Sequence, residues 1–185
     1  MIDAPNMLLI GAAGRDAGKT VFACELVRRF REDAVIAAKV TAIDDQGGAC
    51  PRGGAGCGVC ASLKEDYCIT EETNSTGAKD TQRLLAAGAD RVLWMRVLKK
   101  RLPSGAEALL NQLGGAVPII CESNSLRHVV QPGLFVMLQH QNATTRKDSA
   151  QQVYACADAV VYTDGTRFQF DFDRIVFAHN SWQLC

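Results

Sequence analysis

The stretch that most constrains the fold is residues 13–20, Ala-Gly-Arg-Asp-Ala-Gly-Lys-Thr. It follows a short apolar run, Met7 to Ile10, and precedes a segment, Val21 to Phe30, in which apolar residues recur at helical spacing. The first pattern predicts a buried strand and the second an amphipathic helix. A strand, a glycine-containing turn and a helix in this order are typical of α/β proteins with a parallel sheet.

The same eight residues predict a phosphate-binding loop of the Walker A type. In such a loop backbone N–H groups surround a phosphate, the Lys neutralises phosphate charge, and the Thr hydroxyl ligates Mg²⁺. Ala13 stands where the full pattern has Gly, and the alternative is an ordinary strand-to-helix turn with a surface Lys. We expect Arg15 to line the mouth of the loop; the alternative is that it acts in trans on the phosphates bound by a partner subunit. The candidate nucleotide-binding residues are Ala13, Gly14, Arg15, Asp16, Ala17, Gly18, Lys19 and Thr20.

Further along the chain, apolar periodicity predicts alternating strands and helices. We expect buried strands at 34–42, 91–98, 117–121 and 134–138, and helices at 78–87, 103–113 and 148–155, the first capped by Ser75-Thr76. Asp164-Gly165, between two apolar segments at 159–162 and 167–172, predicts a hairpin. The expected fold is a single domain over residues 1–185, with a doubly wound, mainly parallel sheet of the P-loop NTPase class and an antiparallel edge hairpin at the C-terminus.

Two acidic residues follow predicted buried strands. Glu122 ends the run Val-Pro-Ile-Ile-Cys-Glu, and Asp44 follows the strand that contains Lys39. In α/β sheets ligands bind at the carboxyl ends of strands, and nucleotide-binding loops use such carboxylates to hold Mg²⁺ or its water. We therefore expect Lys19, Glu122 and Asp44 to act in catalysis, and Thr20 with Glu122 to hold Mg²⁺.

Four of the eight cysteines fall within a segment rich in glycine, residues 46–76, which has no sustained periodicity. We interpret this segment as an inserted loop and a candidate metal subsite. Its cysteines have the spacing C-x6-C-x2-C-x7-C, and four thiolates can hold Zn²⁺ or a [4Fe–4S] cluster; the irregular spacing favours iron–sulfur. The alternative is a loop of reduced thiols without metal. The candidate ligands are Cys50, Cys57, Cys60 and Cys68, whereas Cys24, Cys121 and Cys156 are expected in the core.

Composition argues against several classes of partner. The 20 basic and 20 acidic side chains balance, so no electrostatic field favours nucleic acid or an anionic membrane surface. The start, Met-Ile-Asp, lacks the charged and apolar regions of a signal peptide, and no apolar run is long enough to span a bilayer. We expect a cytoplasmic protein.

The segment Lys79-Asp80-Thr81-x-Arg83, followed by Ala87-Gly88-Ala89, resembles a motif of the molybdopterin-guanine dinucleotide biosynthesis protein B family. The resemblance covers about residues 7–125 apart from the insertion, although Val40 and Ser123 depart from the family pattern. It implies a P-loop NTPase of the MinD/dethiobiotin-synthetase-like branch, usually a homodimer, that assists another cofactor-biosynthesis protein.

Together these patterns predict a Mg²⁺-dependent protein that binds or hydrolyses GTP or ATP, and the resemblance implies that it assists molybdenum-cofactor or related metallocofactor biosynthesis. The alternative is a regulatory or carrier protein for a metal or iron–sulfur cluster, in which the nucleotide acts only as a conformational switch.

Overall fold

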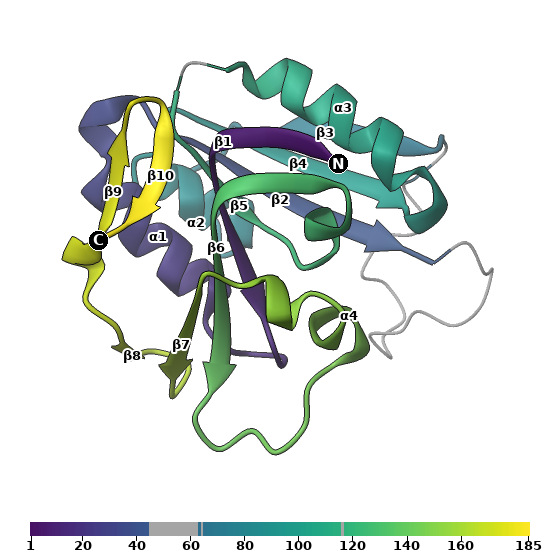
Figure 1. The fold of residues 1–185 in the computed structure, drawn as a ribbon. Helices are drawn as coiled ribbons and strands as arrows, with labels where there is room; N and C mark the ends of the chain where they lie inside the picture. Colours follow the sequence, from purple (N-terminus) through teal and green to yellow (C-terminus); the bar gives the residue numbers. More distant parts are fainter. Residues whose placement is uncertain (45–62, 64, 116) are drawn as a thin grey trace.

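A computed structural model describes residues 1–44, 63, 65–115 and 117–185 (Figure 1). The fold is α/β, built on an eight-stranded mixed sheet with the order β3-β4-β2-β5-β1-β6-β7-β8. The six inner strands pair in parallel, and the edge strands β3 and β8 pair antiparallel to their neighbours. The strands are β1 (Ile2–Ala12), β2 (Ile36–Ile43), β3 (Tyr67–Glu71), β4 (Arg91–Leu98), β5 (Ile119–Glu122), β6 (Val130–His140), β7 (Ala159–Thr163) and β8 (Phe168–Gln169).

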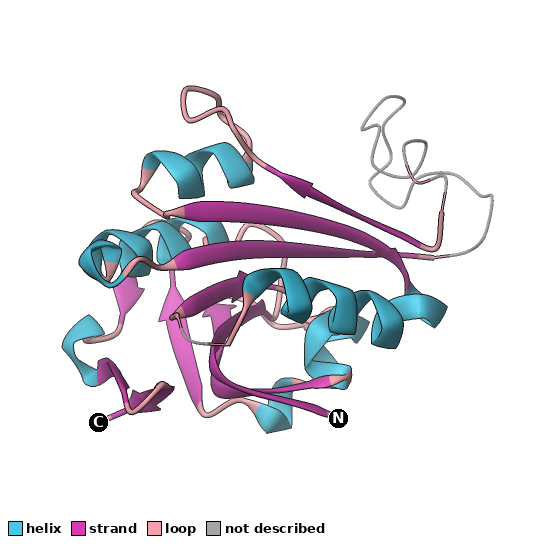
Figure 2. Cartoon of the chain, turned by 90° about the horizontal axis from the view of Figure 1, so that it is seen from above, coloured by secondary structure: helices cyan, strands magenta, loops and turns pink. Residues whose placement is uncertain are grey.

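Helices cover both faces of the sheet, because alternate side chains of each inner strand point to opposite faces and both need apolar cover (Figure 2). On one face apolar side chains of α1 (Lys19–Arg29) and α2 (Asp80–Ala86) belong to the buried cluster that contains Leu8 and Ile10. On the other, those of α3 (Leu102–Leu113) and α4 (Asp148–Gln151) belong to the cluster that contains Met7 and Leu9. Short 3₁₀ turns connect these elements; they lie at Arg31–Asp33, Lys99–Arg101, Ser125–His128, Tyr154–Cys156 and Phe172–Arg174.

A separate antiparallel hairpin, β9 (Ile175–Ala178) and β10 (Ser181–Leu184), closes the chain beside β1 (Figure 1). Its anchor is Trp182, which is almost completely buried. The Trp182 indole Nε1–H donates to the carbonyl oxygens of Asn6, at 2.8 Å, and Ile119, at 3.1 Å. The hairpin therefore belongs to the same core as the sheet.

Most predicted elements occur in the structure with small shifts in their bounds. β4 has the predicted bounds, and the helix after the 13–20 loop begins at Lys19. The predicted cap of α2 is wrong: the helix begins at Asp80 with Lys79 as N-cap, and Thr76 instead donates to the side chain of Asn74.

Two differences concern the sheet edges. β3 lies within the segment predicted to be a loop, because its residues complete the ladder of β4. The predicted strand at 167–172 is wrong beyond Gln169: only β8 pairs with β7, and a 3₁₀ turn begins at Phe172. The aromatic rings of this segment still pack on α1, where Phe22 contacts Phe168 and Phe172.

Candidate nucleotide site

A cavity of about 820 Å³ lies where the carboxyl ends of the central strands meet the start of α1. The residues that line it come from five segments of the chain and are, in sequence order, Arg15, Asp16, Ala17, Gly18, Lys19, Thr20, Val21, Lys39, Asp80, Arg83, Glu122, Lys147 and Ser149. Six of the eight predicted loop residues are in this set. Among the described residues that line the cavity, Ala13 and Gly14 do not occur; Ala13 is fully buried beneath it.

The start of α1 faces this cavity. Gly18 is the N-cap, with φ of 73°, and no side chain caps the helix. The first N–H groups of a helix have no partner within it, and together with the helix dipole they favour an anion at this end. The cavity is therefore lined on this side by a helix end that favours an anion.

Besides its positive φ, position 18 has a second reason to be glycine: the hairpin turn between β7 and β8 approaches it closely. A Cβ atom on Gly18 would lie 2.6 Å from the carbonyl oxygen of Gly165. Asp16 is the other residue of the 13–20 loop with positive φ, at 53°. Ala13 is not among the described residues with positive φ, which explains why Ala can stand at this position.

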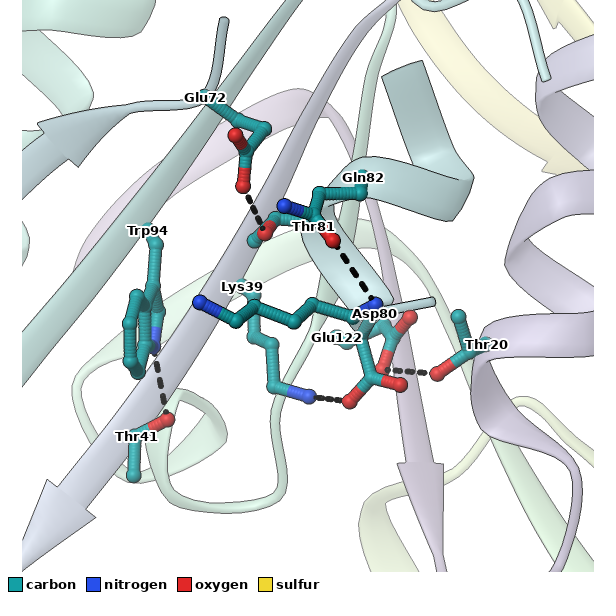
Figure 3. Close-up of polar contacts among 10 residues, drawn as sticks. Thr20, Lys39, Thr41, Glu72, Asp80, Thr81, Gln82, Trp94 and Glu122 are labelled. Atoms are coloured by element: carbon teal, nitrogen blue, oxygen red, sulfur yellow. Dashed lines mark hydrogen bonds and ion pairs between the residues drawn. The ribbon is translucent and has the colours of Figure 1, made fainter. Parts of the chain in front are cut away.

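Glu122 and Thr20 form the polar floor of the cavity. Thr20 Oγ1 donates to Glu122 Oε2 at 3.2 Å, and both side chains are buried (Figure 3). The other carboxylate oxygen, Glu122 Oε1, is buried, and no hydrogen bond reaches it from the described part of the chain. A buried oxygen of this kind needs a partner, because leaving it unsatisfied costs about 1–3 kcal/mol or more.

Lys39 and Asp80 form an ion pair at the side of the cavity (Figure 3). Lys39 lies on β2 directly beside Glu122 in the parallel ladder, so both side chains stand on the same face of the sheet. Asp80 is the first residue of α2. Sequence analysis missed Asp80 as a site residue, although the Lys79-Asp80-Thr81 segment was available as a signal.

The other predicted acidic residue lies elsewhere. Asp44 is half exposed, pairs with Lys99 at 2.6 Å, and is not among the described residues that line the cavity. Asp80, from α2, lines the cavity with Glu122 where Asp44 was expected. The reason is the length of β2, which carries Asp44 past the end of β5.

Of the four predicted cysteine ligands, Cys50, Cys57 and Cys60 lie outside the described residues. Cys68 lies on β3, and its Sγ accepts a hydrogen bond from Arg96 Nη2 at 3.2 Å. Within the described part of the chain, no group of three or more His, Cys, Asp or Glu side chains is arranged to hold a metal ion. The cysteine site therefore stays a prediction.

The remaining cysteines fit their predicted role in part. Cys24 and Cys121 are buried, and burial raises the pKa of both thiols. Such thiols stay protonated and are poor ligands or nucleophiles. Cys156, which was expected in the core, is exposed at the turn that follows α4, because the helix ends at Gln151.

Comparison of the chain with protein-family models, curated proteins and solved structures finds no match. In addition, none of the described helices has the length and apolar character needed to cross a membrane.

Proposed function

We propose that the cavity binds a nucleoside triphosphate with Mg²⁺ and that the protein hydrolyses it or transfers its phosphoryl group. The observation that carries this proposal is the buried Glu122 carboxylate at the uncapped start of α1. One of its oxygens accepts from Thr20, and the other receives no hydrogen bond from the described chain. On this proposal the fold is that of a P-loop NTPase.

The residues fit a bound Mg²⁺. Thr20 Oγ1 and Glu122 are oxygen donors, and hard cations such as Mg²⁺ prefer oxygen ligands while keeping several waters. Glu122 and Asp80 would hold such waters, and Thr20 would ligate the ion. When bound, Mg²⁺ would neutralise charge on the phosphate oxygens.

The protein groups supply binding and charge stabilisation. The N–H groups at the start of α1 and the side chain of Lys19 would bind the β- and γ-phosphates. Four further cationic side chains, Arg15, Lys39, Arg83 and Lys147, line the same cavity and would stabilise charge that develops during phosphoryl transfer. The bound nucleotide is GTP or ATP.

A role in molybdenum-cofactor or related metallocofactor biosynthesis rests on the sequence resemblance around Lys79-Asp80-Thr81. The same resemblance supports a homodimer. The role in cofactor biosynthesis and the homodimer are both part of the proposal, and nucleotide binding does not depend on either.

The test is a binding titration with fluorescent GTP and ATP analogues, with and without Mg²⁺, followed by a phosphate-release assay. We expect Lys19→Ala to weaken binding by about 100-fold or more, because the buried phosphate charge loses its partner. Glu122→Gln keeps the acceptor for Thr20 but removes the negative charge, so it should abolish the dependence on Mg²⁺ and lower turnover by about 100-fold.

The matched control is Lys99→Ala, which removes an equal charge from an exposed site outside the cavity. Its affinity should stay within about twofold of the wild type. Binding of neither nucleotide by the wild type, or an equal loss in Lys99→Ala and Lys19→Ala, would reject the proposal.

A further inference from the structure

Asn124 lies just after Glu122, where the β1–β5 ladder stops. The last backbone bond between these strands runs from the Ser123 N–H to the carbonyl oxygen of Ile10, at 3.0 Å. Asn124 has helical backbone angles, φ −83° and ψ −45°, and begins the turn that leads into the 3₁₀ segment. The backbone of this segment therefore turns away just before it would reach Ala12.

The side chain of Asn124 takes the place of the missing backbone. The Ala12 N–H donates to Asn124 Oδ1 at 2.7 Å, and Asn124 Nδ2 donates to the Ala12 carbonyl oxygen at 3.0 Å. A carboxamide offers a donor and an acceptor together, as a peptide group does. Neither a carboxylate nor a hydroxyl can make this pair of bonds in the same way.

The neighbouring residues accommodate this contact. A Cβ atom on Gly11 would lie 3.0 Å from Asn124 Oδ1, so a side chain there would crowd the carboxamide. Asn124 Nδ2 also lies 3.4 Å from the hydroxyl of Ser149, which lines the cavity. Asn124 thus contacts both the end of β1 and the start of α4.

Ala12 and Ala13 are held from two further sides. The Ala13 N–H donates to the carbonyl oxygen of Leu138 on β6, at 2.8 Å, and its carbonyl oxygen accepts from the Lys147 N–H at 2.9 Å. The contact from the β5 side comes from Asn124. Glu122 is only two residues before Asn124. The bonds between Asn124 and Ala12 therefore also fix the Glu122 carboxylate relative to the 13–20 loop, whose Thr20 donates to that carboxylate.

We propose that Asn124 is a positioning residue, whose carboxamide holds the 13–20 loop in register with Glu122 in the conformation that binds the nucleotide. The role of Asn124 in nucleotide binding rests on the proposed function, whereas its effect on the conformation of the loop can be tested without nucleotide. It adds to the site a residue that touches no phosphate.

The test compares Asn124→Ala with Asn6→Ala. Asn6 is a buried residue in the middle of β1, six residues before Ala12, and its side-chain Nδ2 donates to the carbonyl oxygen of Val117 at 2.8 Å. Each variant removes a carboxamide that forms a hydrogen bond on or to β1, but only Asn124 lies beside the cavity. The first measurement is amide hydrogen exchange of residues 11–20 in the nucleotide-free protein, and the second is the Kd for Mg-nucleotide.

For Asn124→Ala we expect exchange at Ala12 to be at least about tenfold faster and Kd to be about tenfold weaker, below the temperature at which unfolding begins. Asn6→Ala should lower the unfolding temperature while Kd stays within about twofold. Equal protection of residues 11–20 in Asn124→Ala and the wild type would overturn the inference.

Asn124→Asp supplies a signature that a general loss of stability does not give. One carboxylate oxygen still accepts from Ala12, while the other faces the Ala12 carbonyl oxygen and can donate only when it is protonated. Asn124→Asp should therefore lose affinity and amide protection about as much as Asn124→Ala, although its side chain keeps the size and one acceptor of Asn124. Protection of residues 11–20 in Asn124→Asp equal to that of the wild type would count against the inference. If the wild type binds no nucleotide, the proposed function fails, and the exchange measurement still decides the role of Asn124.

Discussion

At the scale of single residues, the 13–20 loop depends on backbone conformation as much as on side-chain chemistry. Gly18 combines a left-handed conformation with a close neighbour, whereas Gly14 has neither: a Cβ there would meet no atom within 4 Å. Two glycines of one motif thus have different requirements. The sequence pattern does not distinguish them.

We predict that Gly18→Ala destabilises the protein by about 1–2 kcal/mol or more, because an L-residue is strained at positive φ and its Cβ meets the Gly165 carbonyl oxygen. Gly14→Ala is the matched control and should change the free energy of unfolding by less than about 0.5 kcal/mol. Chemical denaturation of both variants measures this difference. Equal losses in the two would show that the Gly18–Gly165 contact does not matter.

A second residue-scale prediction concerns Asp164 in the turn between β7 and β8. Its Oδ1 accepts hydrogen bonds from the Thr166 N–H, the Thr166 hydroxyl and the Arg167 N–H, and these bonds lower the pKa of the carboxyl group to about 2. A lowered pKa in the folded state stabilises the turn above the unfolded pKa, about 4. That contribution is lost as the pH falls through about 2.

An NMR titration of the Asp164 carboxyl carbon measures this pKa directly. The stability difference between the wild type and Asp164→Asn should shrink as the pH falls from about 4 to about 2. A midpoint at the ordinary value for Asp would contradict the prediction.

At the scale of elements, the β9–β10 hairpin is integral to the fold. Besides its two hydrogen bonds, Trp182 packs against two aromatic rings. Its ring centroid lies 4.7 Å from that of Phe30, which follows α1 and is met edge-on, and 5.1 Å from that of Phe177 of β9. One side chain thus joins the last strand to β1, β5 and the end of α1. We expect the hairpin to unfold together with the sheet.

Accordingly, Trp182→Ala should lower the free energy of unfolding by about 3–5 kcal/mol, as for other buried aromatic residues. Trp182→Phe keeps most of the ring but leaves the Asn6 and Ile119 carbonyls without this donor, and it should cost about 1–3 kcal/mol. Urea denaturation with Gln183→Ala, an exposed neighbour on β10, as the control measures these losses. A loss in Trp182→Ala no larger than in Gln183→Ala would mean that the hairpin is peripheral.

At the scale of the whole molecule, the cavity collects residues from Arg15 to Ser149, which belong to β2, β5, three helices and the connections that precede α1 and α4. A ligand that contacts all of these elements stabilises their relative positions. It also binds only the folded chain, because the unfolded chain has no such arrangement.

We therefore predict that Mg-nucleotide at about 100 times its Kd stabilises the wild type by about 2.7 kcal/mol. Thermal unfolding with and without the ligand measures this shift. Lys19→Ala should show little or none of it, while Lys99→Ala should match the wild type. A shift of equal size in Lys19→Ala would place the nucleotide outside the cavity.

The sequence by itself determined the α/β class, the run of inner strands and the position of the 13–20 loop before α1. The reason is that apolar patterning and glycine placement are local signals: the apolar run Arg91–Leu98 predicts a strand, and Gly18-Lys19-Thr20 predicts the start of a helix. The expectation that Glu122 ends a buried strand was also confirmed, because four consecutive buried residues admit few alternatives.

Only the tertiary structure decided which side chains meet. Asp80, rather than Asp44, reaches the cavity because α2 packs over β2, and Asn124 reaches Ala12 because β5 ends at Glu122, two residues before the position that would pair with Ala12. β3 is a strand because β4 offers an open edge, and Gly18 must be glycine because a turn about 150 residues later lies against it. These are contacts between residues far apart in the chain, and no local pattern contains them.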